Sequence, residues 1–340
     1  MTVVAFQMRS NHSPRRQRGV AIITVMLVVA LAVIIAANMT QRLSLQMRRA
    51  ENLIHGNQGL WYAIGAEQFA MKILIQGFKD DKDVVHLGQN WAQEGNEFPV
   101  EGGSLGGQII DQQACFNLNS VAGPTPEKEL KTRPPHSRMF QELLEGVGVD
   151  AYEAEQIAEA LRDWLDADSI VSSSAGAEDS EYESMPVPYL AANSLMAHAS
   201  ELRTVRGITA EIYEKVRPYV CAVPENPLLR INVNTIKAEQ ALLLQAALTP
   251  RLTLSDAQDL INNRPKNGYE TIDEFWRQPE VSGAGDVTAA QKESLTVNSF
   301  YFLLQAKTEV ADVTFRLESL LKREQDNKLV VIRRQLGGTQ

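Results

Sequence analysis

The longest run of apolar positions lies near the amino end of the chain, at residues 20–37. These 18 residues, VAIITVMLVVALAVIIAA, carry no charge, and Thr24 is their only polar side chain. About twenty apolar residues in a helix span the roughly 30 Å of a bilayer's hydrocarbon core. The pattern therefore predicts a helix that enters a membrane.

Beyond this run, residues 41–72 mix apolar and charged side chains and contain no proline. Such a pattern is typical of an amphipathic helix with one face available for packing. We therefore expect a single helix to continue from the membrane segment into the rest of the protein. Gly56, Gly59 and Gly65 weaken it locally, which favours a bend there.

Period-two patterns appear near the other end, at residues 299–307, 313–318 and 329–334. In the second run, apolar and polar side chains alternate strictly. Polar breaks separate the three runs, so we predict a three-stranded antiparallel meander. A further strand, or a tight pair of strands, is expected at residues 108–119.

The middle of the chain, from about residue 124 to 285, has a mainly helical pattern. Before it, glycines and prolines interrupt residues 90–107. We interpret that stretch as turns and not as a phosphate-binding loop, because no G-x-x-x-x-G-K-[ST] follows. The expected helices are residues 140–144, 151–164, 194–202, 209–219, 236–248, 255–263 and 271–276.

The residues before the apolar run carry only positive charge. They include Arg9, Arg15, Arg16 and Arg18, without any acidic residue. Positive charge beside a membrane segment holds that end in the cytoplasm, so we expect the remainder on the other side. The small A-x-A residues of an ordinary secretory cleavage site do not follow the run.

A glycine, Gly19, joins the basic leader to the apolar run, and this junction resembles the type IV prepilin and pseudopilin family. The resemblance implies that a prepilin peptidase cuts between Gly19 and Val20 and that the new amino terminus is methylated. Most members carry glutamate at the fifth mature position, where this chain has Thr24. A missing glutamate resembles the K-type minor pseudopilins of type II secretion. A plain signal anchor is the alternative.

The resemblance covers both ends of the chain and implies an α+β fold. In this type IV pilin-like fold, a long N-terminal helix packs on an antiparallel sheet, and a large all-α domain is inserted between the strands. The expected divisions are a leader at 1–19, the membrane and assembly helix at 20–76, the first part of the head at 77–122, the helical insertion at 123–290 and the C-terminal strands at 291–340.

The net charge and the cysteine content limit the partners and the compartment that the sequence fits. The net charge is −9 and the isoelectric point is near 5.2. Nucleic-acid binding requires a basic footprint, so DNA or RNA is not expected as a partner. Cys115 and Cys221 are the only cysteines, both beyond the membrane segment. In an oxidising periplasm they would form a disulfide; two buried free thiols are the alternative.

Two glycine-broken helix pairs, around residues 144–151 and 202–210, look like helix-hairpin-helix turns. This motif often contacts DNA backbones, so a membrane-anchored protein that handles DNA is the main rival function. Phosphate binding there would need basic neighbours. The first hairpin has acidic ones instead, which favours a structural role. These acidic residues are Glu142, Glu145, Asp150, Glu153 and Glu155.

Between the hairpins, residues 163–183 contain seven acidic side chains and no basic one. Such crowding favours a bound cation, and oxygen ligands without histidine or cysteine suit calcium. The spacing is not that of an EF-hand, and a solvated mobile loop is the alternative. The DWxDxD and GAED patterns resemble the calcium-binding region of K-type pseudopilins. That resemblance implies the ligands Asp166, Asp168, Glu178 and Asp179, with Asp163, Glu181, Asn193 and Glu201 as further candidates.

Catalytic motifs are missing from the sequence: there is no nucleophile motif, zinc-ligand spacing or nucleotide loop. We therefore expect a non-enzymatic assembly protein. The resemblance implies a single-pass inner-membrane protein with its C-terminal portion in the periplasm. It also implies a place at the tip of the type II secretion pseudopilus, beside the minor pseudopilins I and J, where the bulky helical insertion fits.

Overall fold

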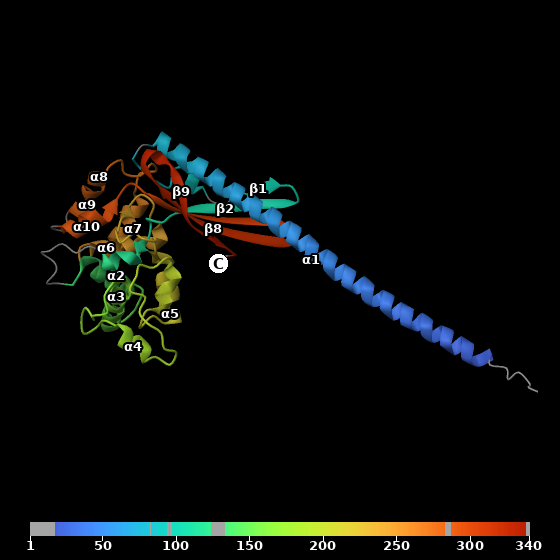
Figure 1. The fold of residues 1–340 in the computed structure, drawn as a ribbon. Helices are drawn as coiled ribbons and strands as arrows, with labels where there is room; N and C mark the ends of the chain where they lie inside the picture. The colour runs from blue at the N-terminus through green and yellow to red at the C-terminus, as the bar shows by residue number, and fades with distance from the viewer. Residues whose placement is uncertain are drawn as a thin grey trace, which may run out of the picture. The chain divides into compact units, whose positions relative to one another are not determined.

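The computed structural model describes residues 18–81, 83–93, 95, 97–123, 133–282 and 287–337. The expected leader therefore lies almost wholly outside the described residues. The chain divides into two compact units, Met1–Asn57 and Gln58–Gln340. One helix, α1 (Arg18–Asp80), contributes to both units (Figure 1, blue).

The first unit is the amino-terminal part of α1. Its apolar side chains are more than half exposed from Val20 to Ile35. The helix is long and apolar enough to cross a membrane once. Gly56 and Gly65 do not interrupt the helix, since α1 is continuous through both.

In the second unit, five antiparallel strands form one sheet in the order β1-β2-β7-β8-β9. The meander predicted near the carboxyl end corresponds to its last three strands. Their register runs from Tyr301 opposite Lys322 to Val310 opposite Val313 between β7 and β8. The five strands are β1 (Glu97–Val100), β2 (Gly103–Asp111), β7 (Tyr301–Val310), β8 (Val313–Arg323) and β9 (Leu329–Leu336).

The hairpin of β1 and β2 corrects the interpretation of residues 90–107 as turns alone. Gly102 has a φ of +79° and makes the turn between the two strands. Gly103 and Gly107 lie within β2, where an added Cβ would fall 1.7 Å from the Glu309 carbonyl oxygen and 2.6 Å from that of Gln305. Glycine therefore serves here to let β2 approach β7 closely. The strand expected at 108–119 ends at Asp111, although Phe116 and Asn117 form a short second strand.

The later part of α1 packs on one face of this sheet. Its buried side chains are three or four positions apart, which is the spacing of one helix face. Three of them are alanines, so the helix lies close to the strands. The layer consists of Ala63, Ala66, Ala70, Leu74 and Phe78 of α1 with Phe302, Leu304, Ala306, Leu317 and Leu321 of the sheet.

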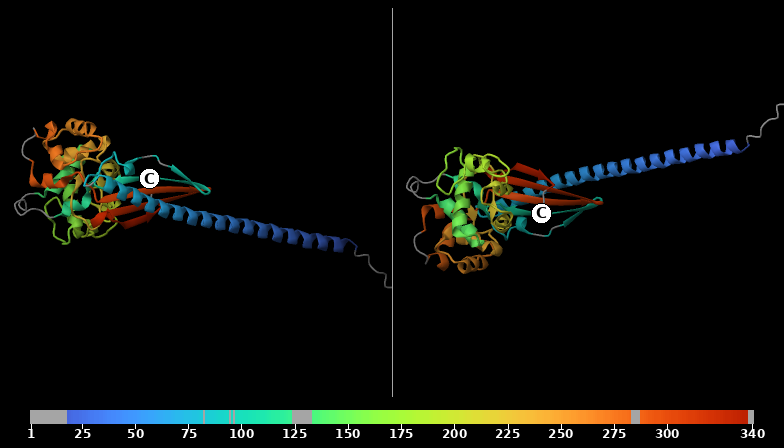
Figure 2. Two further views of the ribbon diagram at one scale, coloured as in Figure 1. Left: turned by 90° about the horizontal axis from the view of Figure 1, so that it is seen from above. Right: turned by 90° about the horizontal axis from the view of Figure 1, so that it is seen from below.

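The helical insertion gathers at one end of the sheet (Figures 1 and 2). It has its own large hydrophobic core, built around α2, α3 and α6. The prediction of a helix at 194–202 is wrong for its first half, because regular structure begins only at Ala199, as a 3-10 turn. The helices are α2 (Pro135–Gly146), α3 (Ala151–Leu165), α4 (Asp179–Glu183), η4 (Ala199–Thr204), α5 (Ala210–Val216), η5 (Arg217–Tyr219), η6 (Ala238–Gln240), α6 (Ala241–Leu248), α7 (Leu254–Asn262), α8 (Ile272–Trp276), α9 (Pro279–Ser282) and α10 (Ala289–Ser294).

Two-stranded parallel ladders and three 3-10 turns complete the described elements. β3 (Phe116–Asn117) pairs with β4 (Val220–Cys221), and β5 (Ile231–Asn232) pairs with β6 (Leu295–Thr296). The paired residues Phe116 and Val220 are 104 positions apart in the sequence, and Ile231 and Leu295 are 64 positions apart. The insertion therefore returns to the head at two places. The turns are η1 (Asn90–Ala92), η2 (Leu118–Ala122) and η7 (Gln325–Asn327).

A buried carboxylate, Asp111, joins the head to the insertion. It accepts hydrogen bonds from the hydroxyls of Ser299 at 2.5 Å and Thr235 at 2.6 Å. Asn232 donates to the same carboxylate at 3.3 Å and to the Val85 carbonyl at 3.0 Å. Burial raises the pKa of Asp111, and these donors offset part of that effect. The end of β2 is thereby fixed to the segment after β5.

We expect Asp111→Ala to lower the free energy of unfolding by about 3 kcal/mol, because it leaves the buried Ser299 and Thr235 hydroxyls without their acceptor. Asp111→Asn keeps one acceptor oxygen and should cost less than half as much. Denaturant unfolding of the detergent-solubilised chain measures both. A loss below 0.5 kcal/mol for the alanine variant would show that the network does not stabilise the junction.

Candidate metal site

The acidic segment begins in the last turn of α3, where Asp163 is completely buried. One oxygen of Asp163 accepts from the Ser172 amide at 3.1 Å, and the other accepts from the Ala177 amide at 2.9 Å. An added Cβ on Gly176 would lie 2.0 Å from this carboxylate. Asp163 therefore fixes the path of the loop between α3 and α4, and both of its oxygens are used in doing so.

The loop brings Asp166, Asp168 and Glu178 together. One carboxylate oxygen from each lies within 4.8 Å of the others. Glu178 is 2% exposed, and neither of its oxygens has a hydrogen-bond partner among the described residues. Asp166 Oδ1 is also buried without a partner. A buried carboxylate without donors is costly, so the arrangement has the chemistry of a cation site.

The electrostatics of the cluster agree with this arrangement. Burial, followed by the charges of Asp168 and Asp163, raises the pKa of Asp166 to about 6. Burial, followed by the charges of Asp163 and Asp166, raises the pKa of Glu178 to about 7. Without a cation, these carboxylates repel one another, so Asp166 and Glu178 hold their protons at a higher pH than isolated carboxyl groups do.

Asn193 supplies a further oxygen next to this loop. Its Oδ1 is buried without a hydrogen-bond partner among the described residues. Its Nδ2 donates to the Ser169 hydroxyl at 3.3 Å, which holds the amide against the acidic loop. The backbone of Asn193 has a φ of +45°, a conformation that asparagine tolerates better than most residues.

The other three candidates have oxygens in structural hydrogen bonds. Asp179 Oδ1 accepts from the Ala191 amide at 3.0 Å. Glu181 Oε2 accepts from the Glu178 amide at 3.0 Å at the start of α4. Glu201 Oε1 accepts from the Ala197 and His198 amides before η4. The structure does not bring these three carboxylates into the cluster.

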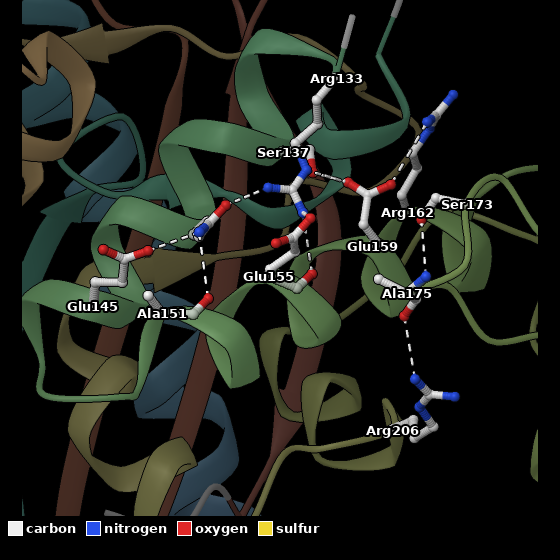
Figure 3. Close-up of polar contacts among 11 residues, drawn as sticks. Arg133, Ser137, Glu145, Ala151, Glu155, Glu159, Arg162, Ser173, Ala175 and Arg206 are labelled. Carbon is white, nitrogen blue, oxygen red and sulfur yellow. Dashed lines mark hydrogen bonds and ion pairs between the residues drawn. The ribbon is translucent and has the colours of Figure 1, made fainter.

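Basic side chains next to the segment already have hydrogen-bond acceptors, as Figure 3 shows. Arg206 donates to the Ala175 carbonyl at 3.1 Å. Arg133 and Ser137 both donate to Glu159 at 2.7 Å. Burial tends to raise the pKa of Glu159, but these two donors outweigh it and lower the pKa. Arg206 was not among the predicted site residues, because a single arginine far along the sequence gives no signal of this contact.

The predicted helix-hairpin-helix turn between α2 and α3 has no free anion site at the helix start. Asp150 accepts a hydrogen bond from the Tyr152 amide at 3.0 Å and thus caps α3 with its own carboxylate. Gly148, with a φ of +91°, makes the turn. A phosphate would meet the negative charge of Asp150 at this position, so the geometry is that of a structural turn.

Cys115 and Cys221 form a disulfide in the structure, with 106 positions between them in the sequence. Cys115 directly precedes β3, and Cys221 is the second residue of β4, its ladder partner. The bond therefore ties the end of the first head segment to β4, within the helical insertion. Of the two alternatives that the sequence leaves open, the structure has the disulfide.

Comparison with known proteins gives consistent matches along the chain. Two family models, both described as type II secretion system (T2SS), protein K, match residues 114–225 and 231–298. The type II secretion system protein K of Aeromonas hydrophila is 43% identical over 96% of this chain and 99% of its own length. That of Pectobacterium carotovorum subsp. carotovorum is 39% identical over 95% of this chain and 97% of its own.

A solved structure is also similar. It is described as the crystal structure of the GspK-GspI-GspJ complex from the enterotoxigenic Escherichia coli type 2 secretion system. The matched chain is 35% identical, with a TM-score of 0.77, and the match covers 86% of this chain and 100% of that one. The match is consistent with a pilin-like fold that carries an inserted helical domain.

Proposed function

Because this chain belongs to the type II secretion system protein K family, we propose that it is the minor pseudopilin at the tip of the type II secretion pseudopilus, where it helps to initiate assembly and the export of folded proteins. The single observation that carries this function is the match to the E. coli complex, which spans the whole of the matched chain. The helical insertion supports it, because a bulky domain is difficult to repeat along a close-packed filament.

The partners that we propose are the minor pseudopilins I and J, because the similar structure is a complex of K, I and J proteins. The test is co-expression of this chain with the I and J proteins of the same organism, followed by purification through a tag on J. We expect a complex with one copy of each. Purified J and I that leave this chain behind would refute the partner assignment.

We also propose that the apolar half of α1 is a single-pass inner-membrane anchor with the head in the periplasm. The basic residues before it, Arg9, Arg15 and Arg16, favour a cytoplasmic amino end. The disulfide between Cys115 and Cys221 agrees with an oxidising compartment for the head. No catalytic step is needed for this role, and we propose that the protein is not an enzyme.

The amino terminus of the mature protein follows from the same assignment. We expect mass spectrometry of protein from cells with a prepilin peptidase to give a methylated Val20 as the first residue. Cells that lack the peptidase provide the control and should retain the leader up to Gly19. An intact leader in the presence of the peptidase would leave the signal-anchor alternative and refute processing.

Thr24 explains how this helix can lack the family's glutamate. Its hydroxyl bonds to the helix's own carbonyls, at 2.9 Å from Ala21 and 3.2 Å from Val20. Its polar group therefore needs no neighbouring subunit. A glutamate at this position would require a partner for its charge within the apolar surroundings. A subunit at the tip has no neighbour above it, so its glutamate would have no such partner.

We expect Thr24→Glu to reduce incorporation into the pseudopilus, and with it secretion, about tenfold or more, because an unpaired carboxylate is costly in a membrane. Thr24→Val, which only removes the hydroxyl, is the matched control and should secrete normally. The measurement is the secreted fraction of a substrate protein in cells that carry each variant. Normal secretion and normal tip complexes with Thr24→Glu would contradict this explanation.

The cofactor that we propose is calcium, held by Asp166, Asp168, Glu178 and Asn193. All four offer oxygen, as calcium prefers, and the unpartnered oxygens of Glu178 and Asn193 support a bound cation. Bound calcium would supply positive charge that offsets the repulsion among the three carboxylates. Asp163 and Arg206 would keep the loop in place around it, through the Ala177 amide and the Ala175 carbonyl.

A further inference from the structure

A cavity of about 430 Å³ lies between the helical insertion and the head sheet, far along the sequence from the acidic segment. Arg230, from the insertion, lines one side, and Lys322 and Arg323, from the end of β8, line another. Among the described residues that line it, none is an aspartate or a glutamate. A cavity whose charged lining residues are all positive is unusual in a chain whose net charge is −9. Its volume is within the usual range of ligand pockets, about 300 to 1,000 Å³.

None of the three basic side chains makes an ion pair with a carboxylate among the described residues, although Asp83 lies near enough to Arg323 for its charge to oppose the lowering of the Arg323 pKa by burial. Arg323 is 7% exposed, and it donates only to the neutral side chains of Asn327 and Asn298. Its guanidinium also lies 4.1 Å from the centre of the Phe78 ring, so its position is fixed. Neither Arg230 nor Lys322 has an ion pair in the described part of the chain. A buried guanidinium that makes no ion pair with the described residues favours an anionic ligand.

Two of the neutral side chains that line the cavity, Asn117 and Gln113, are already held by hydrogen bonds. Asn117 donates to the carbonyls of Asn226 and Leu228 and accepts from the Val223 amide. Gln113 donates to the Arg230 carbonyl at 3.0 Å and accepts from the Phe300 amide at 2.6 Å. Cys115, which forms the disulfide with Cys221, lies between Gln113 and Asn117 in the sequence. The charged groups that a ligand would meet are Arg230, Lys322 and Arg323.

Two large apolar side chains lie at the same cavity and remain accessible. Leu228 is 47% exposed and Phe300 is 46% exposed. A free inorganic anion would leave most of this volume to water and would not contact either side chain. A peptide that carries a carboxylate next to an apolar side chain matches both features.

We propose that this cavity binds an acidic peptide segment of another protein, with a carboxylate at Arg323, Lys322 and Arg230 and an apolar side chain at Phe300 and Leu228. The segment would contact the head and the insertion at the same time. This inference uses neither the calcium site nor the membrane helix, so it can fail while the proposed tip function holds.

The test is binding of short peptides to the full chain in a nonionic detergent, measured by calorimetry. The probes are pooled N-acetylated, C-amidated tetrapeptides that contain two glutamates and two residues chosen from phenylalanine and leucine, in every order. Matched pools carry glutamine in place of glutamate. We expect saturable binding of the acidic pools and binding at least about tenfold weaker for the glutamine pools.

Charge reversal locates the site. Arg230→Glu with Lys322→Glu alters two partly exposed side chains and should weaken binding of the acidic pools about tenfold or more without unfolding the protein. Arg277→Glu with Lys292→Glu is the matched control, because it makes the same change at exposed residues away from the cavity, and it should bind as the parent does.

Three results would overturn the proposal. Equal binding of glutamate and glutamine pools would show that charge is not recognised. Undiminished binding by the Arg230→Glu, Lys322→Glu variant would place the peptide elsewhere. Inorganic phosphate that binds as tightly as the acidic pools and displaces them would make the cavity a site for a free anion.

Discussion

The substitution Glu178→Gln is expected to stabilise the protein in chelator and to destabilise it in calcium. Without calcium, Glu178 is 2% exposed beside Asp166 and Asp168, and removing its charge relieves that repulsion. With calcium, the same substitution removes a charged ligand. At pH 8, where folded Glu178 is ionised, we expect a gain of about 2 kcal/mol in chelator, in line with a pKa raised from 4.5 to about 7, and a loss of similar or larger size in calcium.

The sign of the pH dependence follows from the same group. In chelator, folded Glu178 keeps its proton up to about pH 7, whereas the unfolded chain ionises near 4.5. The folded state of the parent is therefore favoured at low pH, and this contribution disappears as the pH rises through 7. Glu178→Gln lacks this titrating group and should show a smaller loss, because Asp166, with a pKa raised to about 6, still titrates.

Calcium itself should have the largest effect on the parent protein. At a concentration a thousand times its dissociation constant, a ligand stabilises by about 4 kcal/mol, which corresponds to a shift in Tm of roughly 10 °C. Melting curves in calcium and in chelator, at pH 5 and pH 8, measure every part of this prediction. Glu183→Gln, an exposed acid outside the cluster, is the matched control and should respond to calcium as the parent does. Superimposable melts in calcium and chelator would refute the site.

Removal of the Cys115–Cys221 disulfide is expected to lower the free energy of unfolding by about 4 to 5 kcal/mol. The bond closes a loop with a sequence separation of 106, and in the chain-entropy model that restricts the unfolded chain by this amount. The measurement is denaturant unfolding of the parent and of the Cys115→Ala, Cys221→Ala variant in nonionic detergent.

Reductant provides the control for this measurement. It should destabilise the parent by a similar amount and leave the double variant unchanged. A loss below about 1 kcal/mol would mean that the contacts of β3 with β4 and of Asn117 with Asn226 hold the junction without the bond. Equal sensitivity of parent and variant to reductant would point to an effect unrelated to the disulfide.

Local patterns predicted the long helix and the last three strands because those elements carry their own signal. The apolar run at residues 20–37 needs no tertiary contact, and the alternation in β8 has the period of a strand with one buried face. The α+β pilin-like fold with an inserted helical domain is confirmed by the solved relative. The hairpin of β1 and β2 was missed because Gly103 and Gly107 are favourable only next to the carbonyls of β7. That reason is tertiary and is invisible in a local pattern.

The acidic site was predicted as a region more reliably than as a set of ligands. Charge density identified the segment, but loop geometry decides which carboxylates meet. Asp163 and Glu181 carry the same carboxylate group as the proposed ligands, yet their oxygens accept hydrogen bonds from backbone amides. Asn193 lies 15 positions beyond Glu178 in the sequence, and only its unpartnered oxygen links it to the cluster. The ligand set itself stays a prediction until calcium binding is measured.

The position of the subunit in the assembled filament tests the central claim most directly. The measurement is gold labelling of a carboxyl-terminal tag on this chain, on pseudopili isolated from cells that also make the other pseudopilins. We expect gold at one end of each pseudopilus and nowhere along its length. Labels distributed along the filament would contradict a tip subunit, as would pseudopili of normal number and length in cells that lack this chain.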